Sequence, residues 1–442
     1  MQRLLQLLVF IAASFLLIEN LASQNISDKV WDLNTCINYA LDNNIQVKQK
    51  MLNVTSSELE LSKNKSAWLP NLNASVSENL TNSKDKTNVD NWAASNGTSF
   101  SLTASMPIYQ GGSIKNNIRK SQLSVEQANV DVEIIQKSIV LSIVQAYLDV
   151  LYTKESVDYC TEVVSASEKQ VERSKNLFSA GSIVRKDLAQ MEAQLASDNY
   201  SLTVARNNFT SRTTDLKQLL EIPVADTFVV SFPEVRVVDS LANFPSKLEA
   251  INAAITIMPE IRSSQVNNQI AEVNYRMAKS GYLPSLSLNA GYSTDYSSSL
   301  SGGFSNQLSN NQLQKVGLTL NVPIFNRFST RTSVLQSRIG VEQARLSALE
   351  TEKNLQQQVE TIYQDAVAGI YRYKSAKTQM ESADESYRLS EQQFNLGMIN
   401  AVELLKVKTS LLNSKMELIQ SKYSAILNLK ILDYYMGKTI TL

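Results

Sequence analysis

The chain has 442 residues, of which 43% are hydrophobic and 19% are charged, a balance typical of folded proteins. Its 42 Lys and Arg residues equal its 42 Asp and Glu residues, so no cationic surplus points to a nucleic-acid partner. It contains no histidine, which excludes Ser-His-Asp and Cys-His catalysis and His-ligated zinc. Cys36 and Cys160 form no CxxC motif, and the sequence leaves open whether they are free thiols or a disulfide. We therefore expect no catalytic, cofactor or metal site, and we predict that the protein is not an enzyme.

The N-terminus has the pattern of a secretory signal peptide over residues 1–23. Arg3 precedes an apolar run from Leu4 to Ile18, and Ala22-Ser23 supply the small residues of a cleavage site. A retained N-terminal anchor is the alternative, although the run is shorter than the roughly 20 residues that a spanning helix requires. We expect no later apolar stretch of spanning length, and hence an exported chain that is not a helical membrane protein.

The rest of the sequence consists of two similar copies of one unit. Three motifs recur in the same order at nearly constant spacing: Trp68-Leu69-Pro70 as Tyr282-Leu283-Pro284, Pro107-Ile108-Tyr109 as Pro323-Ile324-Phe325, and Phe178-Ser179-Ala180-Gly181 as Phe394-Asn395-Leu396-Gly397. We predict repeat 1 over 24–221 and repeat 2 over 248–442, each beginning with a helix. Several prolines mark residues 222–247 as a linker between the two repeats, with a short strand around Phe228 to Ser231.

One segment of each copy alternates apolar and polar residues as β-strands do. This alternation predicts hairpins over about 71–109 and about 285–325, with strands of about 11 to 12 residues. The polar positions are mostly Ser, Thr and Asn, which suits a wet face opposite an apolar one, although a half-buried soluble sheet has the same pattern. Strand length favours the membrane, because a tilted strand crosses a bilayer in about 9 to 11 residues.

Aromatic residues lie at one end of all four predicted strands, as expected at a membrane interface. They are Trp68, Tyr109, Tyr282 and Phe325. Ordinary packing at strand ends is the alternative explanation. Four strands cannot close a barrel, and unpaired edges in lipid cost several kcal/mol for each free backbone group. The chain is therefore expected to oligomerise, and three copies would supply twelve strands.

The remainder of each copy is predicted to be a long helical hairpin, over about 112–220 with a tip near 181 and over about 328–436 with a tip near 397. Each first arm lacks proline and could approach about 100 Å, but Thr153 and Gly369 mark equivalent points where it could break. The second arms carry hydrophobic residues every seven positions, which predicts coiled-coil packing. These residues are Leu188, Leu195, Leu202, Phe209 and Leu216, and Leu404, Leu411, Leu418, Ala425 and Leu432.

This order of elements resembles the TolC-type outer-membrane factor family over essentially the whole mature chain. The most specific motifs are Pro107-Ile108-Tyr109-Gln110-Gly111-Gly112 with Pro323-Ile324-Phe325-Asn326, and Phe178-x-x-Gly181 with Phe394-x-x-Gly397. The resemblance implies an α+β fold, in which a homotrimer forms a twelve-stranded β-barrel in the Gram-negative outer membrane, continuous with a periplasmic α-helical coiled-coil barrel. It implies a passive exit duct of a tripartite efflux pump or a type I secretion system, gated at its helical tips.

The resemblance also implies partners and site residues. The partners are outer-membrane lipid, a periplasmic adaptor of the membrane-fusion type and an inner-membrane transporter. The adaptor-docking tips map to Gly181, Ser182, Ile183, Gly397, Met398 and Ile399. The periplasmic gate maps to Lys186, Asp187, Gln190, Glu403 and Lys406.

Two of these positions depart from the family pattern. Lys406 stands where the family carries an acidic residue, which predicts a mixed ring with Glu403, although both could simply be solvated helix residues. Ile399 stands where the family can carry a basic side chain, so a closing link would need other partners, such as Lys186 with a carboxylate.

Two other functions fit parts of the sequence. A secreted coiled-coil adhesin or structural protein with short sheets would account for the heptads, and it would be extracted without detergent. An exported enzyme would need a catalytic cluster, and the sequence has no recognisable one. The transported substrate is not encoded in an identifiable motif, because a wide polar lumen selects weakly.

Overall fold

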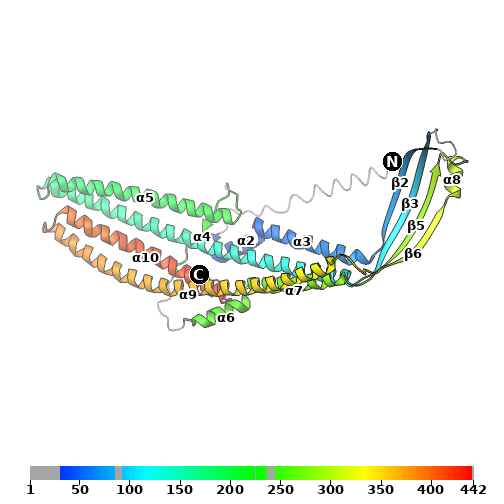
Figure 1. Cartoon of the computed structure of the whole chain (residues 1–442). Helices are drawn as coiled ribbons and strands as arrows, with labels where there is room; N and C mark the ends of the chain where they lie inside the picture. The colour runs from blue at the N-terminus through cyan, green and yellow to red at the C-terminus, as the bar shows by residue number, and fades with distance from the viewer. Residues whose placement is uncertain (1–29, 85–91, 224, 236–243, 441–442) are drawn as a thin grey trace. The chain divides into compact units, whose positions relative to one another are not determined.

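The computed structural model describes residues 30–84, 92–223, 225–235 and 244–440. The predicted signal peptide lies outside these residues, as do parts of the predicted linker and of the first hairpin connection. The chain divides into two compact units, and Figure 1 labels the helices and strands that belong to them. The first, the bundle unit, comprises the described residues within Met1–Lys48, Ile134–Met258 and Asn354–Leu442, and the second, the sheet unit, comprises those within Gln49–Glu133 and Pro259–Lys353.

The sheet unit is built around a four-stranded antiparallel sheet with strand order β2-β3-β5-β6. Its strands are β2 (Asn71–Lys84), β3 (Trp92–Gln110), β5 (Ser285–Ser297) and β6 (Leu313–Asn321). Three strands are longer than the predicted 11 to 12 residues, and β6 is shorter. β6 ends before Pro323, which has no N–H for a ladder, and Arg327 and Phe328 then turn the backbone with φ values of 55° and 61°.

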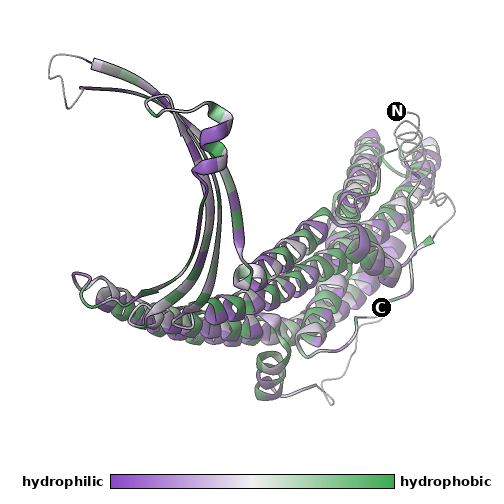
Figure 2. Cartoon of the chain, turned by 90° about the vertical axis from the view of Figure 1, so that its right-hand side faces the viewer, coloured by the Kyte–Doolittle hydropathy of each residue, from purple (hydrophilic) through white to green (hydrophobic). Residues whose placement is uncertain are grey.

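The two faces of the sheet differ in chemistry. In register, Ala74 lies opposite Leu102, and Leu102 lies opposite Tyr292, so apolar side chains share one face. Hydroxyls and amides share the other, where Ser75 and Ser101 are hydrogen-bonded at 2.7 Å and Ser105 donates to Asn289 at 2.9 Å. Figure 2 shows hydrophobic and hydrophilic residues following one another along the strands. The apolar face is uncovered: Val76 is 66% exposed and Val316 is 76% exposed.

A bulge in β3 changes the face on which one aromatic lies. Pairing between β3 and β5 shifts between Pro107 and Tyr109, so that Tyr109 lies opposite Leu286 rather than continuing the polar row of Ser105. Leu286 pairs with Leu320 on the apolar face. The bulge therefore moves Tyr109 to the apolar face of the sheet.

Helices of the sheet unit pack on the first part of α4 (Ser113–Ser179). α3 (Ile45–Lys65) contributes Asn64, whose amide donates to Ser121 at 2.8 Å. α7 (Pro259–Ser280) contributes Val266 and Val273, which are buried against Leu123 of α4. The first part of α9 (Ser329–Asn395) also belongs to this unit.

The connection between β5 and β6 contains a short helix, α8 (Phe304–Asn310), within the segment that was predicted only as a β-hairpin. It lies at the end of β5 that is remote from α7 (Figure 1). The buried side chain of Gln307 holds the connection together: its amide nitrogen donates to three backbone carbonyls, and its oxygen accepts from the Ser297 N–H at 2.9 Å.

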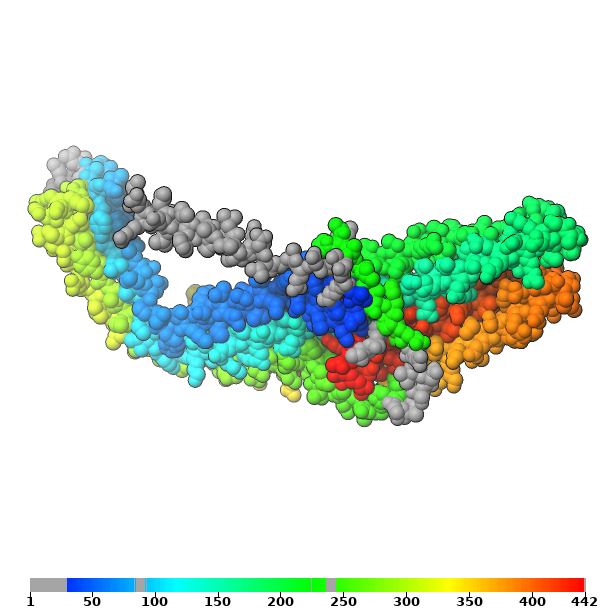
Figure 3. Space-filling model, turned by 180° about the vertical axis from the view of Figure 1, so that it is seen from behind, coloured from blue at the N-terminus to red at the C-terminus, as the bar shows by residue number. Residues whose placement is uncertain are grey.

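The bundle unit contains the long helical hairpins. α5 (Arg185–Leu219) follows α4, and α10 (Ala401–Tyr435) follows α9. Figure 3 shows the α4–α5 pair, in green, lying along the α9–α10 pair, in orange and red. Of the predicted heptad residues, Leu188, Leu202, Leu216, Leu404, Ala425 and Leu432 are buried, and the others are partly buried.

Shorter elements close the other end of the hairpins. β1 (Val30–Trp31) pairs in parallel with β4 (Val229–Val230), within the predicted linker strand. α2 (Leu33–Asn43) and α6 (Lys247–Ile257) flank them in the sequence. Trp31 and Tyr147 are fully buried there, and the Tyr147 hydroxyl donates to the Ser231 carbonyl at 2.7 Å.

α4 and α9 are each 67 residues long and unbroken, so the expected breaks at Thr153 and Gly369 are wrong. The Thr153 hydroxyl donates back to the Asp149 carbonyl within the helix. Gly369 instead allows two helices to approach, because a Cβ at this position would lie 3.1 Å from the Ala425 Cα of α10.

The expectation that no later stretch reaches spanning length is also corrected, because α4 contains an 18-residue stretch that is long and apolar enough. Half of that stretch is buried inside the chain, as in a core helix. Cys36, which is buried, and Cys160, which is half-buried, are thiols and do not form a disulfide with each other. Burial raises the pKa of the Cys160 thiol.

Candidate gating and docking site

The α4–α5 and α9–α10 hairpins turn on the same backbone motif. Gly181 donates to the Phe178 carbonyl at 2.9 Å and Ser182 donates to the Leu177 carbonyl at 2.9 Å. In the second hairpin, Gly397 donates to Phe394 at 3.0 Å and Met398 donates to Gln393 at 2.9 Å. These pairs of bonds are the Schellman motif that ends many helices.

The glycines are required by backbone conformation rather than by lack of space. Gly181 and Gly397 have φ values of 74° and 71°, which side-chain-bearing residues seldom adopt. A Cβ at either position would meet no atom within 4 Å. Met398 is 69% exposed and Ser182 is exposed, whereas Ile183 and Ile399 are half-buried. The predicted tip residues thus form two turns with open surfaces.

An apolar cluster lies directly beneath the second turn. Phe394 is buried there with Ala401 and Leu404 of the same hairpin, and Val171 and Met191 of the first hairpin join them. Ile399 and Tyr387 pack at its margin, where burial raises the pKa of Tyr387 to about 12.

The predicted gate residues lie in the first two turns of α5 and of α10, and their charged groups do not pair with one another in the described chain. Lys186, Glu403 and Lys406 are exposed, whereas Asp187 and Gln190 are half-buried. In the described part of the chain, none of these charged groups belongs to an ion pair. The carboxylates of Asp187 and Glu403 lie at helix N-termini, where the helix dipole stabilises negative charge. The Asn400 side chain caps α10 by accepting from the Glu403 N–H at 3.0 Å.

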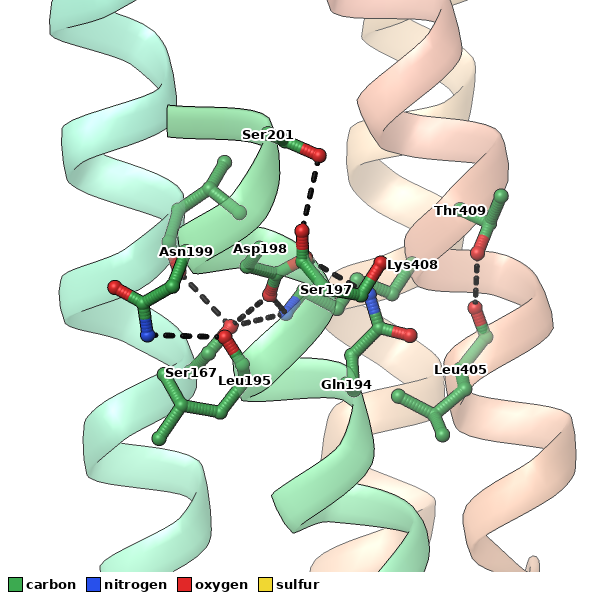
Figure 4. Close-up of polar contacts among 11 residues, drawn as sticks. Ser167, Gln194, Leu195, Ser197, Asp198, Asn199, Ser201, Leu405, Lys408 and Thr409 are labelled. Carbon is green, nitrogen blue, oxygen red and sulfur yellow. Dashed lines mark hydrogen bonds and ion pairs between the residues drawn. The ribbon is translucent and has the colours of Figure 1, made fainter. Parts of the chain in front are cut away.

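Sequence reasoning missed a buried charged network that joins three helices (Figure 4). Lys408 of α10 forms an ion pair with Asp198 of α5 at 2.9 Å, and their side chains are 12% and 4% exposed. Gln194 donates to the other Asp198 carboxylate oxygen at 2.8 Å, and Ser167 of α4 hydrogen-bonds to both Asp198 and Lys408. Every charged member therefore has partners, as a buried ion pair requires.

The signal for this network was present in the sequence. Asp198 lies between the heptad residues Leu195 and Leu202, and Lys408 lies between Leu404 and Leu411. A charge on the apolar face of each of two helices predicts either a pair between them or a polar lumen. Spacing along one helix cannot choose between these outcomes.

A second polar contact joins α4 to α10. The Glu155 carboxylate accepts from Lys422 at 2.8 Å and from the Tyr423 hydroxyl at 2.7 Å. Burial and this hydrogen bond raise the pKa of Tyr423 well above its usual value, so the phenol remains a donor. α10 is thus attached to the first hairpin at two levels.

The family model described as outer membrane efflux protein matches residues 36–220 and 250–438. The chain belongs to this family. The outer membrane protein TolC of Vibrio cholerae is 22% identical over 91% of this chain and 90% of its own length. The structure of CusC superposes with a TM-score of 0.79 at 17% identity, covering 92% of each chain. The Campylobacter jejuni CmeC outer membrane channel superposes with a TM-score of 0.75 at 18% identity, covering 92% of this chain and 85% of that chain.

Membership confirms the predicted location and role. This outer membrane efflux protein is an exit duct for efflux in the Gram-negative outer membrane with a periplasmic extension, and not a secreted coiled-coil adhesin. The family is one of channel proteins rather than enzymes. Within the residues that the structure covers, no group of three or more acidic or cysteine side chains could hold a metal ion.

The structure of the efflux protein brings the four predicted interface aromatics to one end of the sheet. Trp68 precedes β2 and Tyr282 precedes β5, while Tyr109 lies at the end of β3 and Phe325 follows β6. Because neighbouring strands are antiparallel, these four positions lie at the same end of the sheet. All four side chains are more than one-third exposed.

Proposed function

We propose that three copies of this efflux protein close a twelve-stranded β-barrel in the outer membrane and continue it as a periplasmic α-helical coiled-coil barrel. One observation carries this proposal: the sheet exposes an apolar face and ends in two edge strands, β2 and β6, that pair with no further strand in the described chain. Open strand edges are excluded in lipid, so β6 of one copy would pair with β2 of the next. The hydroxyl-rich face would then line a wet lumen.

Exposed apolar stripes on two helices support assembly of the helical part. On α9, Leu335, Ile339 and Leu346 are about half exposed, at spacings that place them near one face. On α3, Leu52 and Leu59 are both 68% exposed and lie seven residues apart. Contact between neighbouring copies would remove these side chains from water and stabilise the trimer.

The helical tips act as the gate and as the docking site in this proposal. A periplasmic adaptor of the membrane-fusion type would bind Gly181, Ser182, Ile183, Gly397, Met398 and Ile399. Glu403 and Lys406 of three copies would form a mixed ring near the axis, with Lys186, Asp187 and Gln190 around it. Adaptor binding would favour the open tips, because a ligand shifts a conformational equilibrium toward the state that it binds more tightly.

Movement of α10 relative to the first hairpin would have to preserve or break the Asp198–Lys408 pair. An inner-membrane transporter would supply the energy, and the duct itself would be passive. A type I secretion system is the second assembly that could use the same duct.

Single-channel conductance in planar bilayers tests the gate. We expect the wild-type chain to form channels, and Glu403→Ala or Lys406→Ala to raise their conductance by removing charge from the constriction. Lys175→Ala, on an exposed position of α4, is the matched control and should leave conductance unchanged. Unchanged conductance in both gate variants would remove these residues from the gate, and failure of the wild type to form any channel would contradict the duct.

A further inference from the structure

A cavity of about 620 Å³ lies in the sheet unit, where β3 passes into α4. Its walls include Trp68 and Tyr109, and its cationic lining consists of Lys115 and Arg119 of α4 and Arg276 of α7. The gate and the adaptor-docking residues lie elsewhere, in the bundle unit. The cavity therefore belongs to neither function assigned above.

The charged side chains that line this cavity are all cationic. Lys115 and Arg119 lie one turn apart on the same face of α4, and no acidic side chain lines the cavity in the described structure. Neither residue forms an ion pair within the part of the chain that is described. Arg276 approaches Glu272 at 3.6 Å, but both side chains are more than half exposed, so solvent weakens this pair. Lys115 and Arg119 thus face the cavity without an acidic partner in the described chain and Arg276 has only the exposed Glu272, so the lining keeps a net positive charge that favours an anionic ligand.

Two glycines form the turn from β3 into α4 beside the cavity. Gly111 and Gly112 have φ values of 60° and 82°, so β3 can turn directly into α4. A Cβ on Gly111 would lie 2.6 Å from the Ser280 carbonyl oxygen, so glycine lets this turn pack against the end of α7. Gly112 lines the cavity, and a Cβ there would meet no atom within 4 Å.

The aromatic wall indicates which kind of anion fits. The β-bulge after Pro107 places Tyr109 on the apolar face of the sheet, the face that the proposed barrel turns toward lipid. Tyr109 is 43% exposed and Trp68 is 41% exposed, so flat amphipathic rings lie beside the cations. Aromatic rings at headgroup depth with basic side chains just outside them match the chemistry of a phospholipid at the membrane surface.

We propose that this cavity binds the phosphate of an anionic phospholipid in the periplasmic leaflet, with Lys115, Arg119 and Arg276 around the phosphate and Trp68 and Tyr109 against the glycerol and upper acyl chains. The bound lipid would fix the depth of the barrel at its helical junction. This inference rests on the proposed barrel, because only membrane insertion places the cavity at a leaflet. A free phosphate ester offers the same charge, and the test separates the two sources.

The test measures lipid retained by the full-length protein, purified in neutral detergent, by native mass spectrometry. Equimolar phosphatidylglycerol and phosphatidylcholine are the probes. We expect wild-type protein to retain phosphatidylglycerol preferentially, and Lys115→Gln/Arg119→Gln/Arg276→Gln to lower that retention by about tenfold or more. A matched triple variant, Lys169→Gln/Arg173→Gln/Lys175→Gln, removes the same charge from exposed positions of α4 in the bundle unit and should retain wild-type binding.

Further measurements distinguish a lipid from a soluble phosphate ester, and distinguish loss of charge from misfolding of a variant. Millimolar glycerol 3-phosphate should not displace the lipid; displacement at that concentration would assign the cavity to a soluble anion and overturn the proposal. The exchange variant Lys115→Arg/Arg119→Lys/Arg276→Lys retains the charge and should retain the lipid. Equal retention of both lipids by the wild type would also overturn the proposal, without any need for a variant.

Conductance in pure phosphatidylcholine bilayers distinguishes this inference from the proposed function. Wild-type channels in that bilayer, together with no preference for phosphatidylglycerol, would leave the duct intact and refute the lipid site. Absence of wild-type channels in any bilayer would refute the barrel, and the lipid site with it.

Discussion

The two hairpin tips share a backbone but differ in what lies beneath them. Both turns carry a Phe-x-x-Gly motif and the same pair of Schellman hydrogen bonds. Phe394 is only 4% exposed, whereas its counterpart Phe178 is 40% exposed. Asn400 caps α10 with its side chain, whereas Val184 at the start of α5 supplies no such bond.

This difference separates what a motif determines from what its surroundings determine. Glycine and local hydrogen bonds set the turn, and they act within six residues. Burial of the phenylalanine depends on residues from the other hairpin, such as Val171 and Met191. The second tip is therefore anchored in the protomer, whereas the first leaves its aromatic ring partly exposed to solvent.

The Asp198–Lys408 pair attaches α10, the helix that follows the second tip, to the first hairpin. Its disruption should cause the largest loss in the free energy of unfolding. Lys408→Met leaves a buried carboxylate without its cation, and we expect a loss of about 3–5 kcal/mol in the free energy of unfolding. The double variant Asp198→Leu/Lys408→Met removes both charges and should recover at least half of that loss. Denaturant titration of the helical signal measures both, and equal losses in the single and double variants would contradict the account.

The two phenylalanines test the contrast directly. Phe394→Ala deletes a buried ring and should cost about 3 kcal/mol, because the cavity cannot fully collapse. Phe178→Ala should cost less than about 1 kcal/mol, because the ring is already exposed. Measured in the same titration, similar losses at the two positions would show that the first ring is covered in the assembled protein.

The helix caps at the two tips also differ, and changes to them should have the smallest effect on stability. Asn400→Ala removes the bond to the Glu403 N–H and should cost about 1 kcal/mol. Val184→Asn offers the first hairpin the cap that it lacks and should gain a few tenths to about 1 kcal/mol. Thermal unfolding of the paired variants measures the two shifts, which should have opposite signs.

Local periodicity predicts much of the fold, and contacts between distant segments account for the rest. Alternating residues identify the segments that form β2 and β3, and absence of proline identifies the arms that form α4 and α9. Thr153 and Gly369 misled the prediction because a residue that weakens an isolated helix is tolerated where another helix packs closely, as α10 does at Gly369. The face of Tyr109 escaped prediction because a bulge changes the parity of a strand without changing its sequence pattern.

The same holds for the candidate site: its local turns could be predicted from sequence, whereas its contacts between helices could not. The tip glycines could be located from sequence because a turn needs them locally. The heptad places Lys408, and not Lys406, on the apolar face of α10, but it could not show whether Lys408 pairs with Asp198 or lines a polar lumen. α8 was missed because Gln307 holds it through backbone carbonyls, a contact that composition does not record.

The mass of the detergent-extracted protein tests the central claim most directly. Light scattering of the full-length chain, purified from the outer membrane and corrected for bound detergent, should give a protein mass three times that of one mature chain. A monomer of the mature chain, or a protein released from the cell envelope without detergent, would contradict the closed barrel and the duct that depends on it.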